Sequence, residues 1–257
     1  MLRILDLYSG IGGFSKAFED VSSEHFKTHA FCEIDKYAQL VLKKHWPLTP
    51  IFEDVRTLPS AMFRHRIEII CGGYPCTGHS VAGKKEGLNN EASGLWSEYR
   101  RIIEDVKPRY VIIENSHNLR STGLVDVLRD ISSLGYNIEW SIISAYSVGA
   151  PHQRERIYIV AWRKDVPYCD PFRSWNANSE KAKTKQEWWT GGRIKRSDLF
   201  EQARTIEPKF LRVNDGIPDG LHANHERIKQ LGNSIVPLIV EEIAKRILEN
   251  EIENNAN

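Results

Sequence analysis

The sequence of 257 residues predicts an α/β fold with a mostly parallel, doubly wound sheet and a second, small lobe. The first observation behind this prediction is that short apolar runs alternate with segments whose apolar residues recur at helical spacing. Strands separated by helices of ten to fifteen residues are typical of βαβ units. The second observation is that this regularity stops after Trp162 and resumes near residue 227.

The regular part of the chain predicts six strands and five helices. The strands are expected at residues 3–9, 28–34, 67–73, 109–115, 138–146 and 156–163. Four helices are expected at residues 14–20, 35–45, 95–106 and 124–134. A fifth helix is expected to begin at Pro237 and to return to the core, because proline is favoured at the first helical position. The tail at 251–257 is expected to be frayed.

The stretch at 163–224 predicts an inserted or appended lobe, while 1–162 and 225–250 form the main domain. The lobe is rich in Trp, Asn, Lys and Arg, and it contains turn signals such as WWTGG and NDGIPDG. Residues 163–212 hold twelve Lys and Arg against seven Asp and Glu, although the whole chain has a formal net charge of +1. A solvated, loop-rich extension is the alternative interpretation.

Composition excludes several classes of protein. No segment approaches the ~20 apolar residues that a membrane helix needs. The N-terminus meets the charged Asp6 too early for a secretory signal, so a soluble, cytoplasmic protein is expected. Cysteines at 32, 71, 76 and 169 lack the spacing of a zinc site or the density of a disulfide scaffold, so we expect free thiols and no metal.

The segment DLYSGIGGF at 6–14 follows the first strand and opens the first helix. A glycine-rich turn at this place lets backbone N–H groups approach a cofactor. Glu33 ends the second strand, where an acidic side chain can bind ribose hydroxyls. Together they indicate a cofactor that contains adenosine. The GxGG spacing argues against a dinucleotide, and Tyr8 is expected either over the adenine or in the core.

The segment CGGYPCTGHS at 71–80 follows a short apolar run that ends a predicted strand. A cysteine on such a loop is accessible, and its thiolate is a good nucleophile toward an electron-poor carbon. This interpretation fits Cys76, whereas Cys71 fits a small buried apolar residue better.

Two further segments bring charged groups to strand ends. The run RYVIIENS places Glu114 and Asn115 at the end of a strand, where a buried carboxylate is costly unless it is paired or used in catalysis. A helix cap is the alternative role for Glu114. Arg154 and Arg156 are two residues apart, so on a strand they project from one face and can hold a carboxylate or phosphate. Ordinary surface ion pairs are the alternative for these arginines.

Taken together, these segments resemble the motif set of the DNA (cytosine-5) methyltransferase family. The matching pieces follow the family's order: DLYSGIGGF, FCEIDKYAQ, EDVRTL, GGYPC with Ser80, SGLW, ENS, QRERIYIV and LGNSIVP. They extend from residue 6 to residue 237 and cover most of the chain outside 163–224.

The resemblance implies a Rossmann-like catalytic domain, at 1–162 and 225–250, that binds S-adenosylmethionine and releases S-adenosylhomocysteine. It implies double-stranded DNA as the partner and a small target-recognition region at 163–224. Cys76 would attack C6 of a flipped-out cytosine, Glu114 would hold or protonate N3, and Arg154 and Arg156 would orient the carboxylate and the base. The cofactor-binding positions implied are Tyr8, Gly10, Ile11, Gly12, Glu33, Ile34, Asp54, Pro75, Leu95 and Asn233. The DNA-contact candidates are Thr77, Ser80, Arg173, Lys183, Lys185, Arg193, Lys195 and Arg196.

The sequence departs from the common family pattern at several places. TGHS follows Cys76 where a Gln and a bulky residue are usual, ENS replaces ENV with the Glu intact, and Ile34 stands where several relatives carry an aromatic residue. The family's usual recognition motif before the last helix is not recognisable. The absence of a regulatory extension favours a restriction–modification or phage enzyme, with a monomer as the expected state.

Two other functions are compatible with the motifs. A catalytically silent member would bind DNA or a protein partner, but the intact Cys76 and Glu114 argue against it. Methylation of RNA instead of DNA is the second alternative, because some relatives act on tRNA and the motifs discriminate poorly between the two. A pyridine-nucleotide oxidoreductase would need a GxGxxG turn, which the sequence lacks.

Overall fold

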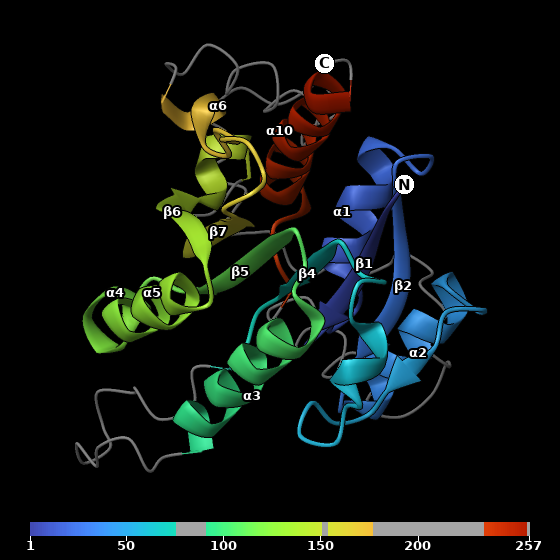
Figure 1. Cartoon of the computed structure of the whole chain (residues 1–257). Helices are drawn as coiled ribbons and strands as arrows, with labels where there is room; N and C mark the ends of the chain where they lie inside the picture. The colour runs from blue at the N-terminus through green and yellow to red at the C-terminus, as the bar shows by residue number, and fades with distance from the viewer. Residues whose placement is uncertain (76–90, 151–153, 177–233, 256–257) are drawn as a thin grey trace, which may run out of the picture.

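The computed structural model describes residues 1–75, 91–150, 154–176 and 234–255 (Figure 1). The strands are β1 (Leu2–Leu7), β2 (Phe26–Cys32), β3 (Ile51–Phe52), β4 (Ile69–Gly72), β5 (Tyr110–Ser116), β6 (Tyr136–Ser144) and β7 (Glu155–Arg163). The helices are α1 (Gly13–Val21), α2 (Lys36–His45), η1 (Ser60–Phe63), α3 (Glu91–Val106), α4 (Leu119–Thr122), α5 (Leu124–Ser133), η2 (Ala145–Val148), α6 (Arg173–Asn176) and α10 (Pro237–Asn255).

The described strands form one sheet of seven in the order β3-β2-β1-β4-β5-β7-β6. Neighbouring strands from β3 to β5 pair in parallel, whereas β7 pairs antiparallel with both β5 and β6. The chain runs outward from β1 to β3, returns to β4, and then continues to the other edge. This reversal beside β1 is the place where open α/β sheets bind their ligands.

Helices cover both faces of the sheet. On one face α1 and α10 lie side by side, and their apolar residues join the sheet in a core cluster that includes Phe18, Ile243 and Tyr158 (Figure 1). On the other face α3 and α5 pack against the sheet through residues such as Ile103 and Val127. Because both faces are covered, the central strands are apolar along nearly their whole length.

Local sequence explains where the helix that follows β2 begins. The Asp35 carboxylate caps α2 by accepting hydrogen bonds from the backbone N–H groups of Tyr37 and Ala38, at 2.9 and 3.1 Å. Such a cap satisfies N–H groups that have no partner within the helix. At the other end of the chain, Pro237 is the first residue of α10, as expected from its fixed φ angle.

The α/β class, the mostly parallel sheet and all the strands and helices expected from the sequence are confirmed. The short elements β3, η1, α4, η2 and α6 were not anticipated, because two- to four-residue elements leave no periodic pattern. The expectation of a frayed tail from residue 251 is wrong for residues 251–255, because these residues continue helix α10. There the Glu251 carboxylate accepts hydrogen bonds from Arg109 Nη2 and Tyr110 Oη, each at 2.7 Å, and so holds the end of the helix on the sheet.

The first residues of the expected lobe pack on the main core. Val166, Cys169 and Phe172 are buried in the same cluster as α10 and α1, and Trp175 packs against it. The rest of that lobe, 177–224, lies outside the described residues.

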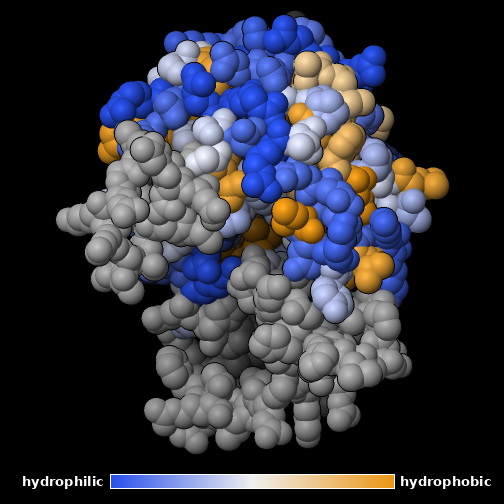
Figure 2. All heavy atoms as spheres, turned by 90° about the horizontal axis from the view of Figure 1, so that it is seen from below, coloured by the Kyte–Doolittle hydropathy of each residue, from blue (hydrophilic) through white to orange (hydrophobic). Residues whose placement is uncertain are grey.

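On the face shown in Figure 2, the described residues are mostly hydrophilic, with scattered hydrophobic residues among them. Cys32, Cys71 and Cys169 are free thiols, and all three are buried. The burial of Cys71 agrees with its interpretation as a small apolar residue of the core. None of the described helices combines the length and the apolar composition needed to cross a bilayer.

Candidate active site

A pocket of about 930 Å³ lies at the carboxyl edge of the sheet, where β1, β2, β4 and β5 end. Residues just after β1, β2 and β4 and the last residues of β5 contribute to its walls, and α3 supplies a further wall. The lining residues include Tyr8, Gly10, Glu33, Ile34, Asp54, Val55, Arg56, Gly73, Tyr74, Pro75, Gly94, Leu95, Glu98, Glu114, Asn115, Arg154 and Arg156. The topology therefore gathers side chains from distant parts of the sequence into one cavity.

The glycine loop and the end of β2 are joined by one carboxylate. Glu33 Oε2 accepts from the backbone N–H of Gly10, and Oε1 accepts from that of Asp35, both at 2.7 Å. Burial raises the pKa of Glu33, while the two backbone N–H groups act against this shift. A carboxylate held in this way is oriented, and its remaining lone pairs can accept hydrogen bonds from a ligand in the pocket.

Gly12 has a structural role in the same loop. Its φ angle is 85°, and a Cβ atom there would lie 2.7 Å from the Trp46 ring and 2.9 Å from the Leu42 side chain. Only glycine combines this left-handed conformation with so close an approach of α2. Gly12 and Ile11, both expected in the cofactor site, are not among the residues that line the pocket.

Tyr8 lines the pocket and also packs against the apolar core. Its hydroxyl donates to the carbonyl of Leu95 at 2.9 Å, and its ring stacks on Tyr99 with the centroids 6.1 Å apart. Its φ angle of 51° is uncommon for a residue other than glycine, and such conformations cluster at functional sites. The ring both packs on the core and lines the pocket, so the two expectations for Tyr8 are compatible.

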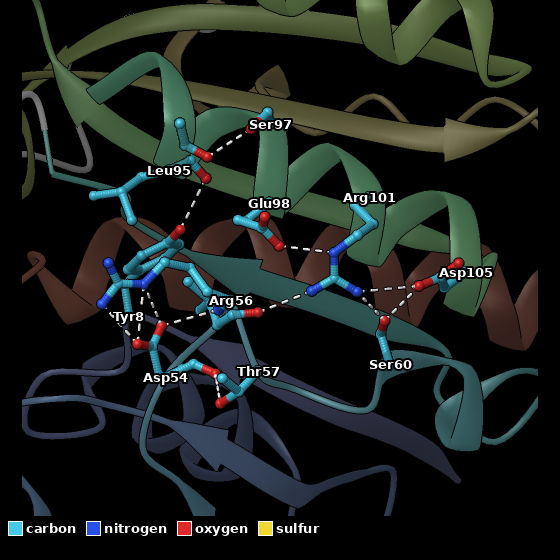
Figure 3. A network of polar contacts seen from close by, with 12 residues as sticks. Tyr8, Asp54, Arg56, Thr57, Ser60, Leu95, Ser97, Glu98, Arg101 and Asp105 are labelled. Carbon is cyan, nitrogen blue, oxygen red and sulfur yellow. Dashed lines mark hydrogen bonds and ion pairs between the residues drawn. The ribbon is translucent and has the colours of Figure 1, made fainter. Parts of the chain in front are cut away.

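Asp54 and Arg56 form a two-point ion pair on the wall beside β3 (Figure 3). Arg56 Nε donates to Oδ1 of Asp54 at 2.9 Å, and Nη2 donates to Oδ2 at 2.7 Å. Hydrogen bonds from Arg56 lower the pKa of Asp54. Asp54 was expected to line the cofactor site, whereas the sequence analysis did not assign Arg56 to it. The position of Arg56, two residues after Asp54, was the signal that could have indicated this ion pair.

Glu114 and Arg156 meet at the other end of the pocket. Arg156 Nε lies 3.0 Å from Oε1 of Glu114, whose residue is only 7% exposed. Burial raises the pKa of Glu114, and the nearby guanidinium groups of Arg156 and Arg154 oppose this shift. Raising the pKa favours the protonated carboxyl group, which can then donate a hydrogen bond.

The antiparallel direction of β7 explains this meeting. Ser116 at the end of β5 pairs with Arg156 at the start of β7. Arg154 also lines the pocket, and its Nη1 donates to the carbonyl of Ser234 at 2.5 Å, just before α10. The two arginines therefore lie in one site, as the sequence predicted.

The loop after β4 approaches Glu114 closely. A Cβ atom on Gly73 would lie 2.9 Å from Glu114 Oε2, so a larger residue would displace the carboxylate. Asn115 Nδ2 donates to the carbonyl of Tyr74 at 3.1 Å. This bond holds the backbone one residue before Pro75, which lines the pocket and directly precedes Cys76 in the sequence.

The pocket thus unites most of the described residues expected in the site. Of the cofactor positions it contains Tyr8, Gly10, Glu33, Ile34, Asp54, Pro75 and Leu95. Arg173, a DNA-contact candidate, is exposed on α6 and does not line the pocket. The expected positions outside the described residues are Cys76, Thr77, Ser80, Lys183, Lys185, Arg193, Lys195, Arg196 and Asn233.

Residues 2–214 match a family model described as C-5 cytosine-specific DNA methylase. The chain belongs to this family. The Type II methyltransferase M.CviJI of Paramecium bursaria Chlorella virus IL3A is 36% identical to this chain over 187 residues, which are 72% of the chain and 48% of the relative. M.HhaI of Haemophilus parahaemolyticus is 31% identical over 169 residues, 64% of the chain and 50% of the relative. The chain therefore spans about half the length of these curated relatives.

Its fold is also that of a solved methyltransferase. The structure of Entamoeba histolytica methyltransferase EhMeth superposes with a TM-score of 0.66 at 14% identity, covering 97% of this chain and 98% of that chain. The Rossmann-like methyltransferase fold expected from the sequence is thereby confirmed. Within the part of the chain that the structure describes, no group of three His, Cys, Asp or Glu residues could hold a metal ion.

Proposed function

We propose that the protein methylates C5 of cytosine in double-stranded DNA, with S-adenosylmethionine as the methyl donor. The observation that carries this proposal is the single pocket that joins the glycine loop and Glu33 to Glu114, Arg154 and Arg156. A methyl donor and a target base must meet within bonding distance, and this pocket has a candidate wall for each. Membership of the C-5 cytosine-specific DNA methylase family supports the same reaction.

The described residues suit an adenosine-containing cofactor. The buried Glu33 carboxylate can accept ribose hydroxyl groups, and the exposed Ile34 side chain next to it offers an apolar surface for the adenine. Tyr8, Gly10, Asp54, Pro75 and Leu95 complete this half of the pocket. When bound, S-adenosylmethionine supplies an electrophilic methyl group on a sulfonium.

The other half of the pocket suits a cytosine. The target atoms are inaccessible in a duplex, so the base must leave the stack at a cost of a few kcal/mol. Cys76 Sγ then adds to C6 as a thiolate, while Glu114 binds N3 and provides its proton. Arg156 holds the Glu114 carboxyl group in place, and Arg154 ties this end of the pocket to the segment before α10. After C5 has gained its methyl group, solvent takes the C5 proton, the C5–C6 double bond forms again as the C6–S bond breaks, and N3 returns its proton to Glu114. The Cys76 thiolate and the aromatic ring are thereby restored.

Different parts of the chain are proposed to catalyse the reaction and to contact DNA. Residues 1–162 and 225–250 form the catalytic domain, and 163–224 recognise the target. Thr77, Ser80, Arg173 and the Lys and Arg residues between 183 and 196 contact DNA, because phosphate contacts come mostly from such side chains. The proposed biological role is restriction–modification or phage self-protection, which agrees with relatives named as Type II methyltransferases. The protein is proposed to act as a monomer in the cytoplasm.

The decisive experiment is incubation of the protein with S-adenosylmethionine and unmethylated DNA, followed by mass spectrometry of the digested nucleosides. The native protein should form 5-methylcytosine, and Cys76→Ala should form none, because the three cysteines that the structure describes are buried and cannot replace the nucleophile. Cys169→Ala is the matched control, since it removes a buried thiol outside the pocket and should leave product formation intact.

Each other result contradicts a defined part of the proposal. Product from Cys76→Ala would exclude Cys76 as the nucleophile. Product on tRNA but not on DNA would change the substrate to RNA. Absence of product on both would favour a silent binding protein.

A further inference from the structure

One guanidinium on α3 joins two walls of the pocket (Figure 3). Arg101 Nη2 donates to the carbonyl of Val55 at 2.9 Å, and its Nε donates to Glu98 Oε2 at 2.7 Å. Val55 and Glu98 both line the pocket, whereas Arg101 lies behind them and does not. The side chain can therefore affect a ligand in the pocket only through these neighbours.

The wall that contains Val55 depends on such support. Strand β3 has two residues, so the chain leaves the sheet just before Asp54. It then turns, with the N–H of Thr57 donating to the carbonyl of Asp54 at 3.1 Å. Arg101 Nη1 donates to Ser60 Oγ at 2.7 Å, and this hydroxyl donates to Asp105 Oδ2 at 2.5 Å. The turn is thus bonded to α3 at Val55 and at Ser60.

The opposite wall belongs to α3 itself. Leu95 and Glu98 line the pocket from this helix, and the Leu95 carbonyl accepts the hydrogen bond from Tyr8. Arg101 lies one helical turn beyond Glu98 and is bonded to it. Its guanidinium links the backbone of Val55, the neighbour of Asp54, directly to the Leu95–Glu98 wall.

The energetics favour a geometric role for these bonds. The Arg101 side chain is 37% exposed, and ion pairs at such exposure add little to the stability of the fold. Its bonds to the Val55 carbonyl and the Ser60 hydroxyl are directional and charge-assisted, so they restrict the position of the turn. Each of these bonds joins two residues that are more than forty positions apart in the sequence.

We propose that Arg101 is a positioning residue that sets the separation of the Asp54 and Leu95–Glu98 walls and thereby the affinity for S-adenosylmethionine. This inference rests on the proposed function of the pocket as the cofactor site. Arg101 does not line the pocket, so it acts on a bound cofactor only through Val55 and Glu98. Loss of Arg101 should therefore weaken cofactor binding, because the walls shift, and it should leave the chemical step unchanged.

The test compares Arg101→Ala with Arg100→Ala. Arg100 is the adjacent residue, is 36% exposed, and pairs with Glu104 and Asp130, neither of which lines the pocket. Arg101→Ala should raise the Kd of S-adenosylhomocysteine, measured by calorimetry, and the KM of S-adenosylmethionine by about tenfold. Its kcat at saturating cofactor and its KM for DNA should match the native protein, and Arg100→Ala should match it in all four quantities.

Several results would overturn the inference. Equal weakening by both variants would indicate a general effect of removing an arginine from α3. A lower kcat with unchanged KM in Arg101→Ala would place its effect on the chemical step. If Arg101→Ala does not fold, Ser60→Ala removes one of the bonds of Arg101 together with the bond from the hydroxyl to Asp105, and it should raise the same Kd by a smaller factor. An unchanged Kd would overturn the inference. Failure of the native protein to bind S-adenosylhomocysteine would instead contradict the proposed function.

Discussion

Asp6 illustrates what burial does to a single charged residue at this site. Its carboxyl group is fully buried at the end of β1, where Oδ2 accepts hydrogen bonds from the backbone N–H and the hydroxyl of Ser15. Burial raises the pKa of Asp6 to about 7, with the hydrogen bonds from Ser15 acting against the shift and the charge of Glu33 reinforcing it. Cys71 on β4 also contributes a hydrogen bond. The group can therefore be protonated in the native state when it would be ionised in the unfolded chain.

This difference predicts a pH dependence of stability. Between about pH 4 and pH 7 the native state holds a proton that the unfolded state has lost, so the free energy of unfolding should fall as pH rises, by at most about 1.4 kcal/mol per pH unit from this group. Asp6→Asn cannot titrate and should remove that part of the slope. Urea unfolding at several pH values in this range measures it. An unchanged slope in the variant would show that Asp6 is ionised throughout.

At the scale of an element, the loop at the end of β4 and the strand β5 determine where Glu114 lies. The absence of a side chain at Gly73 allows the loop to approach Oε2 of Glu114, and Asn115 holds the loop from the opposite side through the Tyr74 carbonyl. Each of the two consecutive glycines therefore reflects a close contact: Gly73 with Glu114, and Gly72 with the backbone of β1, where a Cβ atom would lie 2.0 Å from the carbonyl oxygen of Leu7.

Gly73→Ala should displace the Glu114 carboxyl group, because the new Cβ atom would lie 2.9 Å from Oε2. Small misplacements of catalytic groups cost roughly 10- to 100-fold in rate, so kcat should fall by about that factor while the protein remains folded. Single-turnover methylation with saturating DNA and cofactor measures this. Gly94→Ala is the control, since a Cβ atom there meets nothing within 4 Å although Gly94 also lines the pocket. Equal rates for the two variants would contradict the role assigned to Gly73.

For the whole molecule, helix α10 completes the core beside the glycine loop. Helix α10 packs along α1, and Ile235 just before it lies where a side chain on Gly13 would stand. Ile239, Ile243 and Ile247 of α10 are fully buried. The two ends of the chain are thus parts of one folding unit, and the glycine loop lies at their junction.

Ile243→Ala should lower the free energy of unfolding by about 2–5 kcal/mol, because it leaves a cavity in this core. Ile252→Ala on the same helix is the matched control: Ile252 is 53% exposed, and its loss should cost within about 0.5 kcal/mol. Urea unfolding followed by circular dichroism measures both variants. Similar losses for both would show that α10 contributes by its helical propensity and not by its contact with the core.

The α/β class, the succession of the longer strands and helices along the chain, and ten of the residues that line the pocket could be predicted from the amino-acid sequence alone. This was possible because burial imposes periodic patterns, and because glycine, proline and acidic residues at strand ends carry local signals. Glu33, Glu114 and Pro75 were all assigned to the site from such signals, together with the motif resemblance. Arg101 escaped detection because its place on an amphipathic helix resembles that of any exposed arginine.

How these segments contact one another could be learned only from the tertiary structure. Local patterns do not encode the direction of β7, yet its antiparallel pairing with β5 brings Arg156 to Glu114, whereas a parallel strand would carry it to the opposite edge of the sheet. The same holds for Gly73, whose neighbour Glu114 is forty-one residues away, and for residues 251–255, whose helix is held by Arg109 and Tyr110. Contacts between distant segments depend on the packing of the whole chain, and this packing determines the geometry of the pocket.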